Sequence, residues 1–258
     1  MMKLISVITI VLVFSFIASG SVDAATTVFE ENFESYAQTS NLSGQGGWSG
    51  DVIYIGNGGG LGTNVVSAQI RGNGESWSKN TFETSLSSTN VYTLTFDAFA
   101  YSNFSHDSGI FFGESGNYNS WSVGWYSNWG RGWYFDARGI TDSDFNAEKN
   151  REYFAGGTGH PVNFSVVLDP VVGEVYGFAD FGSGLFETTH YGITSSQFST
   201  VDGVQILQDY RNNYGSGGGE FDNIRVTASP VAPEPISSIL FVTGGTLLAG
   251  RRCLRKRK

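Results

Sequence analysis

Apolar and polar residues alternate along much of the stretch 26–229, and this period of two is typical of β-strands with one buried face. In VYTLTFDAFAYS, the apolar side chains at alternate positions of 92–100 share one face. In VNFSVVLD, alternate positions of 162–168 do the same. The turn sequence DPVVG follows directly, so residues 168–175 are predicted to form a β-hairpin.

Similar runs recur along the stretch: VSAQIRG, GIFFGES, SWSVGWYS, GWYFDAR, DGVQILQD and FDNIRVTA. Glycine-rich segments such as GNGGGLGTN and YGSGGGE predict turns or loops between them. We find no amphipathic helix of useful length, and we interpret TDSDFNAEKNREYF as one helical turn or a loop. With no linker to divide the stretch, we predict an all-β fold, a two-sheet antiparallel β-sandwich (jelly roll) over residues 25–229.

The composition is that of a β protein without disulfides. Glycine accounts for 35 of 258 residues, and aromatic residues for 15%. Glycine destabilises helices, and aromatic side chains favour pleated, half-buried surfaces. The single cysteine, Cys253, lies near the end of the chain, so the predicted domain must be stabilised by its buried core, with or without a metal ion.

Residues 1–24 have the features of a secretory signal peptide. Lys3 gives a short positive region, residues 4–17 are apolar, and Val22 and Ala24 place small residues where a signal peptidase cuts. We expect a signal helix that is cleaved after Ala24. The alternative is an uncleaved anchor, for which the apolar run is shorter than the ~20 residues a membrane span needs.

The segment 230–258 has three parts in a fixed order. The triplet Pro233, Glu234 and Pro235 precedes a 15-residue apolar stretch, 236–250, which as a helix is expected to span only ~22 Å. Six cations follow it, which are expected to stop transfer on the cytoplasmic side. These are Arg251, Arg252, Arg255, Lys256, Arg257 and Lys258.

This order of parts resembles the PEP-CTERM sorting signal of Gram-negative bacteria. The resemblance implies that exosortase, a membrane protease, recognises the triplet and processes the tail. It further implies secretion, passage through the inner membrane, and release to the cell surface or an extracellular matrix rich in exopolysaccharide. The alternative is an ordinary tail anchor with an incidental Pro-Glu-Pro triplet.

The charge of the chain is divided between its ends and its body. Without the leader and the last eight residues, the chain keeps 8 cations and 23 acids, a net charge near −15. Such a surface repels phosphate backbones, so nucleic acid is not an expected partner. It suits divalent cations or neutral ligands better.

The two ends of the predicted domain, FEENFESY with GQGGW and GEFDNIRV, resemble concanavalin-like and carbohydrate-binding-module jelly rolls, whose first and last strands lie side by side. In that group an early carboxylate and an aspartate on the last strand often hold a structural calcium. The resemblance implies Glu31 or Glu34 together with Asp222 as the ligands. The alternative is that Asp222 ends a strand by hydrogen bonding and that no metal binds.

The sequence gives little support for catalysis. Laminarinase-like glycoside hydrolases of the same fold use Glu-x-Asp-x-x-Glu. Glu220 and Asp222 match the first two positions, but Arg225 replaces the acid that would protonate the leaving group. The histidines His106, His160 and His190 are scattered and have no metal-ligand spacing.

The block YNSWSVGWYSNWGRGWYFDAR is rich in aromatic residues that could stack on sugars. We expect most of these rings to belong to the core. Trp129, in the turn SNWGRG, is the best candidate for ligand contact, and the candidate set also includes Trp121, Trp125 and Arg131. The leading hypothesis is a non-enzymatic surface protein that binds carbohydrate or acts in adhesion; a glycoside hydrolase and a purely structural matrix component are the alternatives.

Overall fold

The computed structural model describes residues 24–38, 40–51, 53–56, 60–61, 64–67, 74–100, 108–113, 121–127, 132–138, 151–210 and 219–231. Residues 1–23 of the predicted signal peptide, residues 232–258 with the Pro-Glu-Pro triplet, Trp129 and Arg131 lie outside these residues, so the predictions for them remain predictions. Residues Ala25–Ser229 form one compact unit. Within the described ranges, no helix is both long and apolar enough to cross a membrane.

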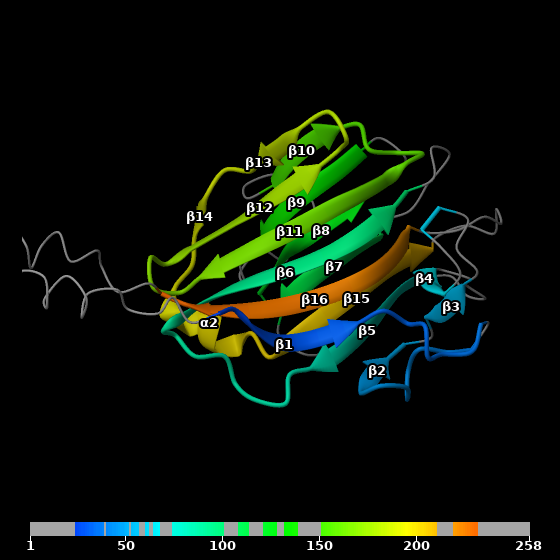
Figure 1. Ribbon diagram of the computed structural model, residues 1–258, viewed down its shortest axis with the longest axis horizontal. Helices are drawn as coiled ribbons and strands as arrows, with labels where there is room; N and C mark the ends of the chain where they lie inside the picture. Colours follow the sequence, from blue (N-terminus) through cyan, green and yellow to red (C-terminus); the bar gives the residue numbers. More distant parts are fainter. Residues whose placement is uncertain are drawn as a thin grey trace, which may run out of the picture. The chain divides into compact units, whose positions relative to one another are not determined.

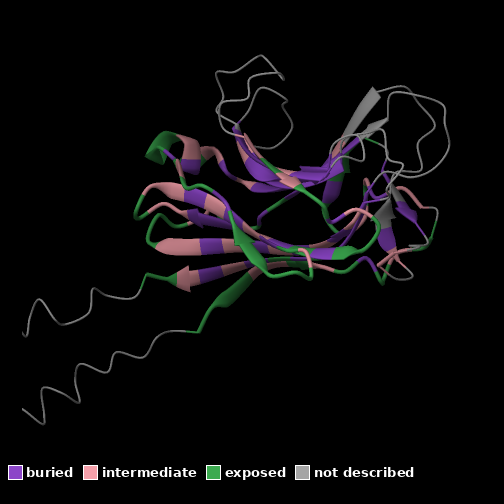
Figure 2. Ribbon diagram, turned by 90° about the horizontal axis from the view of Figure 1, so that it is seen from above, coloured by how far each residue is buried: buried purple, intermediate pink, exposed green. Residues whose placement is uncertain are grey.

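Two antiparallel sheets lie one over the other (Figures 1 and 2). The strands of the larger sheet are β1 (Thr26–Glu31), β3 (Tyr54–Gly56), β4 (Val65–Ser67), β6 (Asn90–Phe99), β11 (Pro161–Asp169), β12 (Glu174–Asp180), β13 (Leu185–Glu187), β14 (Tyr191–Gly192) and β16 (Glu220–Pro230). Seven of them follow the order β13-β12-β11-β6-β16-β4-β3, while β1 pairs with β16 and β14 pairs with β12.

The smaller sheet has seven strands. These are β2 (Trp48–Gly50), β5 (Gly74–Thr81), β7 (Ser108–Gly113), β8 (Ser122–Ser127), β9 (Gly132–Arg138), β10 (Arg151–Ala155) and β15 (Gly203–Tyr210). Their order is β10-β9-β8-β7-β15-β5-β2. The predicted two-sheet β-sandwich is therefore confirmed. Strand β10 lies at the end of the segment that we interpreted as a helical turn or a loop.

The first and last strands of the sandwich are neighbours, as expected. Strand β1 runs antiparallel to β16, with Thr26 opposite Ala228 and Glu31 opposite Ile224. Beyond this pairing, β16 continues beside β4 through Glu220 and Phe221. The pairing brings the two ends of the domain together, and Asp222 lies where β16 changes partners.

The core lies between the sheets and is built from the alternating apolar residues. The inward side chains of β6 and β11 are at most 2% exposed: Tyr92, Leu94, Phe96, Ala98, Val162, Phe164, Val166 and Leu168. Phe164 is central, with its ring centroid 4.8 Å from that of Trp125 and 4.6 Å from that of Trp133. Gly177 leaves room for these rings, because a Cβ there would lie 2.8 Å from the Trp125 indole nitrogen.

One short helix, α2 (Ser195–Thr200), closes an end of the sandwich. Thr194 caps it: its side chain accepts from the Gln197 backbone N–H, and the Gln197 side chain accepts from the Thr194 backbone N–H. This reciprocal pair is a capping box, which the sequence TSSQ signals. The six residues of α2 are too few to show an amphipathic period, so the sequence pattern did not predict this helix. Phe198 packs from this helix against Tyr92, at 6.2 Å between ring centroids.

Candidate functional site

The outer face of the seven-stranded sheet carries a row of mainly aromatic side chains, one from each of several neighbouring strands. The register aligns Trp77, Leu207, Gly109, Tyr126, Tyr134 and Tyr153 across the sheet. The ring centroids of Tyr126 and Tyr134 are 5.2 Å apart, and those of Tyr134 and Tyr153 are 4.8 Å apart. The three tyrosines therefore form a continuous aromatic strip, which we call the tyrosine strip.

Strand alternation explains this strip. In β8, Trp125 faces the core, so its neighbour Tyr126 faces outward, and Phe135 and Tyr134 divide in the same way in β9. Gly124 keeps the face flat, because a Cβ there would lie 2.8 Å from the ring of Phe111. Phe111, Tyr126 and Leu207 consequently form a second small apolar cluster, separate from the core.

A charged pair lies beside the tyrosine strip. The Arg151 guanidinium is 3.5 Å from the Asp136 carboxylate, and its central carbon lies 5.2 Å from the Tyr126 ring centroid and 5.6 Å from that of Tyr134. Tyr126 is only 1% exposed, whereas Tyr153 is 46% exposed. The accessible end of the strip is therefore at β10, where an aromatic face lies close to the Arg151–Asp136 pair.

The aromatic block selected from the sequence is divided by the fold. Trp121 and Trp125 lie in the core and are 2% and 0% exposed. The indole N–H of Trp125 donates to the backbone oxygen of Ser165 at 2.9 Å. Trp129 and Arg131 are outside the described residues; in the chain they belong to the connection from β8 to β9, the strands that carry Tyr126 and Tyr134. The sequence analysis did not single out Tyr134 and Tyr153, although alternation in GWYFDAR predicts that Tyr134 and Trp133 face opposite sides of the sheet.

Glu31, one of the predicted calcium ligands, already serves as a local hydrogen-bond acceptor. Its Oε1 accepts from the Phe33 backbone N–H at 2.8 Å. Its Oε2 accepts from the Tyr36 hydroxyl at 2.5 Å and from the Trp48 indole N–H at 3.2 Å. Burial and this bond to Glu31 raise the pKa of Tyr36. Both oxygens of Glu31 therefore fasten the segment after β1, which leaves little of their capacity for a metal.

Asp222 is a carboxylate that the fold buries near the start of the last strand. It is 8% exposed and lies next to Asn223, whose φ of 51° is left-handed, at the point where β16 changes partner strands. Burial raises its pKa from the ordinary 3.8 to about 6. The carboxylates of Glu34, Asp97 and Glu31 add to this rise, although the Asn223 backbone N–H donates to Asp222 Oδ1 at 2.7 Å and opposes it.

Asn64 has a buried side-chain oxygen and contacts the segment that follows β1. Its amide nitrogen lies 3.3 Å from the backbone oxygen of Glu34 and 3.4 Å from that of Tyr36. Its Oδ1 is buried and has no hydrogen-bond partner in the described parts of the chain. Calcium prefers carboxylate and carbonyl oxygens; Asp222 and Asn64 have such oxygens, while those of Glu31 already accept hydrogen bonds. In the described ranges, no three His, Cys, Asp or Glu side chains converge to hold a metal ion, and calcium remains a prediction.

Glu220, the position that matches the nucleophile of the hydrolases, is a structural anchor in this fold. It is 2% exposed, and its Oε2 accepts from the backbone N–H groups of Gly60 and Leu61 at 2.9 and 3.1 Å. Arg225 is exposed and donates to the Thr27 hydroxyl at 2.7 Å. The pair Glu220 and Asp222 belongs to β16 of the larger sheet, whereas the tyrosine strip belongs to the other sheet.

His190 has partners that the sequence did not indicate. Its ring nitrogens lie 2.9 Å from Glu174 and 3.0 Å from Glu187, and its ring stacks on Tyr176 at 4.0 Å. Hydrogen bonds to Glu174 and then to Glu187 raise the pKa of His190. Both nitrogens donate only in the imidazolium form, and in that form the cluster is an exposed ion bridge between β12 and the segment after it. His160 is exposed, and His106 lies outside the described residues.

Comparison with known proteins supports the fold. No protein-family model and no curated protein matches the chain. The CBM2 module of the evolved Dit of Lactobacillus casei BL23 phage J-1 has a TM-score of 0.52 and 9% identity, over 81% of this chain and 98% of that one. A lectin from Bauhinia forficata in complex with GalNAc has a TM-score of 0.51 and 7% identity, over 81% of this chain and 100% of the lectin. A protein of unknown function from Shewanella oneidensis MR-1 has a TM-score of 0.51 and 14% identity, over 86% of this chain and 94% of that protein. At such low identity the similarity concerns the fold alone: the described body is a β-sandwich of the lectin-like jelly-roll type.

Proposed function

We propose that this chain is an exported, non-enzymatic carbohydrate-binding protein of the cell surface or extracellular matrix. The observation that carries the proposal is the tyrosine strip, which ends at the exposed ring of Tyr153 and has the Arg151–Asp136 pair against its Tyr126 and Tyr134 rings. Sugar rings present apolar C–H faces that stack on aromatic side chains, while charged groups nearby orient the hydroxyls. The lectin-like fold supports the same proposal.

The charge of the body narrows the ligand class. With a net charge near −15 between the leader and the last eight residues, the protein repels strongly anionic polymers. Beside the strip, Arg151 is paired with Asp136, so this part of the face presents no excess positive charge. We therefore expect a neutral polysaccharide, bound along its length on an open face.

Replacing Tyr153 by Ala should weaken binding to a neutral polysaccharide about fivefold, because one stacking contact is worth about 1 kcal/mol. The measurement is affinity electrophoresis or calorimetry of the full chain on a panel of neutral glucans, galactans and mannans. Phe178→Ala removes a half-buried ring from the outer face of the other sheet and should leave binding unchanged. Equal losses in the two variants, or no binding to any member of the panel, would contradict the proposed face.

The proposed route to the surface rests on the two ends of the chain. Exosortase would recognise Pro233, Glu234 and Pro235 after export, while the short apolar stretch holds the protein in the inner membrane. Glu234→Ala should then accumulate an unprocessed, membrane-associated form, detected as a larger band on immunoblots of fractionated cells that contain exosortase. Arg251→Lys keeps the charge and serves as the matched control. Normal processing of the Glu234 variant would rule out recognition of the triplet.

A further inference from the structure

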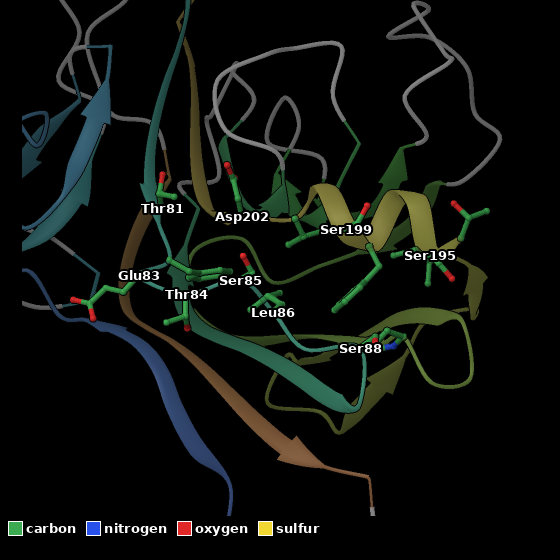
Figure 3. Close-up of a pocket in the computed structure, with 15 residues that line it drawn as sticks. Thr81, Glu83, Thr84, Ser85, Leu86, Ser88, Ser195, Ser199 and Asp202 are labelled. Carbon is green, nitrogen blue, oxygen red and sulfur yellow. The ribbon is translucent and has the colours of Figure 1, made fainter.

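A hollow lies at one end of the sandwich, apart from the tyrosine strip. It has a volume of about 580 Å³ and lies between the connection from β5 to β6 and the helix α2. Figure 3 shows Thr84, Ser85 and Leu86 on one side, with Ser195 and Ser199 of α2 on the other. Pockets of this size, about 300 to 1,000 Å³, are typical of small-ligand sites.

The lining has a distinctive chemistry. Of the fifteen residues around the cavity, all of them described, seven are Ser or Thr, two are the carboxylates Glu83 and Asp202, and none is Lys, Arg or His. The remaining six are apolar and include Leu86 and Phe198. A lining that combines apolar side chains with hydroxyl groups matches a ring that has one C–H face and several hydroxyl groups.

One lining residue has an unmet hydrogen bond. Asp202 Oδ1 is buried and accepts no hydrogen bond from the residues that the structure describes. A buried acceptor without a donor costs free energy, and a ligand hydroxyl would satisfy this oxygen once the Asp202 carboxylate, which lines the hollow, turns toward it. The backbone of Asp202 is held on both sides: its N–H donates to Gly113 and its carbonyl accepts from Phe82.

We propose that this cavity is a saccharide site that takes a single neutral pyranose unit, such as the end of a glycan chain. The proposal rests on the proposed function and adds a second site to it. An open strip can bind the interior of a polymer, whereas a hollow bounded by α2 and the opposite segment suits a chain end or a free sugar. The two carboxylates and the lack of basic groups reject uronic acids and phosphorylated sugars.

Ligand-observed saturation-transfer NMR on the full chain tests this site with methyl glucoside, methyl galactoside and methyl mannoside, and with glucuronate as the anionic comparison. At least one neutral glycoside should bind, and glucuronate should bind roughly tenfold more weakly or not at all. Asp202→Asn should weaken the neutral glycoside roughly tenfold, because it replaces a charged acceptor with a neutral one. Absence of signal from all three neutral glycosides would overturn the proposal.

A blocking variant locates the signal. Ser85→Trp should fill the cavity and abolish glycoside binding, and Ser195→Trp fills it from the opposite wall if the first variant does not fold. Ser183→Trp, at an exposed turn outside the lining, is the matched control. A signal that survives both blocking variants would refute the cavity as the site. Glycoside binding that is lost in Ser85→Trp while polymer binding persists supports two separate sites. Glycoside binding without any polymer binding would instead contradict polysaccharide binding at the tyrosine strip and support the cavity as a separate saccharide site.

Discussion

Replacing Trp125 by Ala should lower the free energy of unfolding by about 4 kcal/mol, the largest effect expected of any single substitution considered for this protein. Trp125 is 0% exposed, and its ring lies 4.8 Å from Phe164 and 5.3 Å from Phe135 between centroids. The substitution removes these contacts and leaves a cavity between the sheets. It also leaves the backbone oxygen of Ser165 without the indole donor. Chemical denaturation monitored by far-ultraviolet circular dichroism measures the change.

A conservative partner separates a core role from a ligand role for Trp125. Trp125→Phe keeps much of the apolar volume, so it should cost less than half as much stability and should leave polysaccharide binding unchanged. Tyr153→Ala should show the opposite pattern, because that ring is 46% exposed: little change in unfolding and weaker binding. If Trp125→Phe lost binding while it remained folded, Trp125 would return as a ligand contact.

The sequence predicted which residues share a face, because a strand has a period of two and the apolar positions follow it. The alternating residues of 92–100 and 162–168 are buried as expected. The hairpin after them also forms, since Asp169 Oδ1 accepts from the backbone N–H groups of Val171 and Val172, both at 3.0 Å, and Gly173 adopts a φ of 80°. These features depend on local chemistry, which a short window of sequence contains.

The site was harder to predict because it depends on which strands become neighbours. The tyrosine strip exists only because β9 lies between β8 and β10, and β10 itself was hidden in a charged segment. In YNSWSVGWYS, alternation predicts that Trp125 and Tyr126 lie on opposite faces of the strand, but it does not predict which of the two faces the other sheet. Likewise, the sequence indicates Glu31 as a candidate calcium ligand but not its hydrogen-bond donors. Tyr36 and Trp48 donate to its carboxylate only in the folded chain.

The buried carboxylate of Asp222 should make the metal-free protein less stable as the pH rises from about 4 to about 6. Its folded pKa is raised from 3.8 to about 6, so the folded state binds more protons than the unfolded state in this window. Stability is therefore greatest below the unfolded pKa and falls as pH passes through the folded one. A shift of about two units corresponds to at most about 3 kcal/mol. Asp222→Asn removes the ionisation and keeps an oxygen for the Asn223 N–H, so with chelator it should raise the melting temperature by about 5 °C at pH 7.5 and change little at pH 4.

At neutral pH, calcium should make the unmodified chain melt at a higher temperature than Asp222→Asn, the reverse of the order expected with chelator. A divalent cation held by Asp222 and Asn64 Oδ1 would favour the ionised carboxylate, so millimolar calcium should raise the melting temperature of the unmodified chain by several degrees. The increase should disappear in Asp222→Asn and shrink in Asn64→Ala, while Glu31→Gln should still respond, because the oxygens of Glu31 are already engaged by hydrogen bonds. Magnesium at the same concentration controls for ionic strength and should have a smaller effect, since it demands a tighter octahedral site. Identical melting curves in calcium and in chelator would end the calcium proposal, and the dependence on pH would then stand alone as the consequence of burying Asp222 where β16 changes partners.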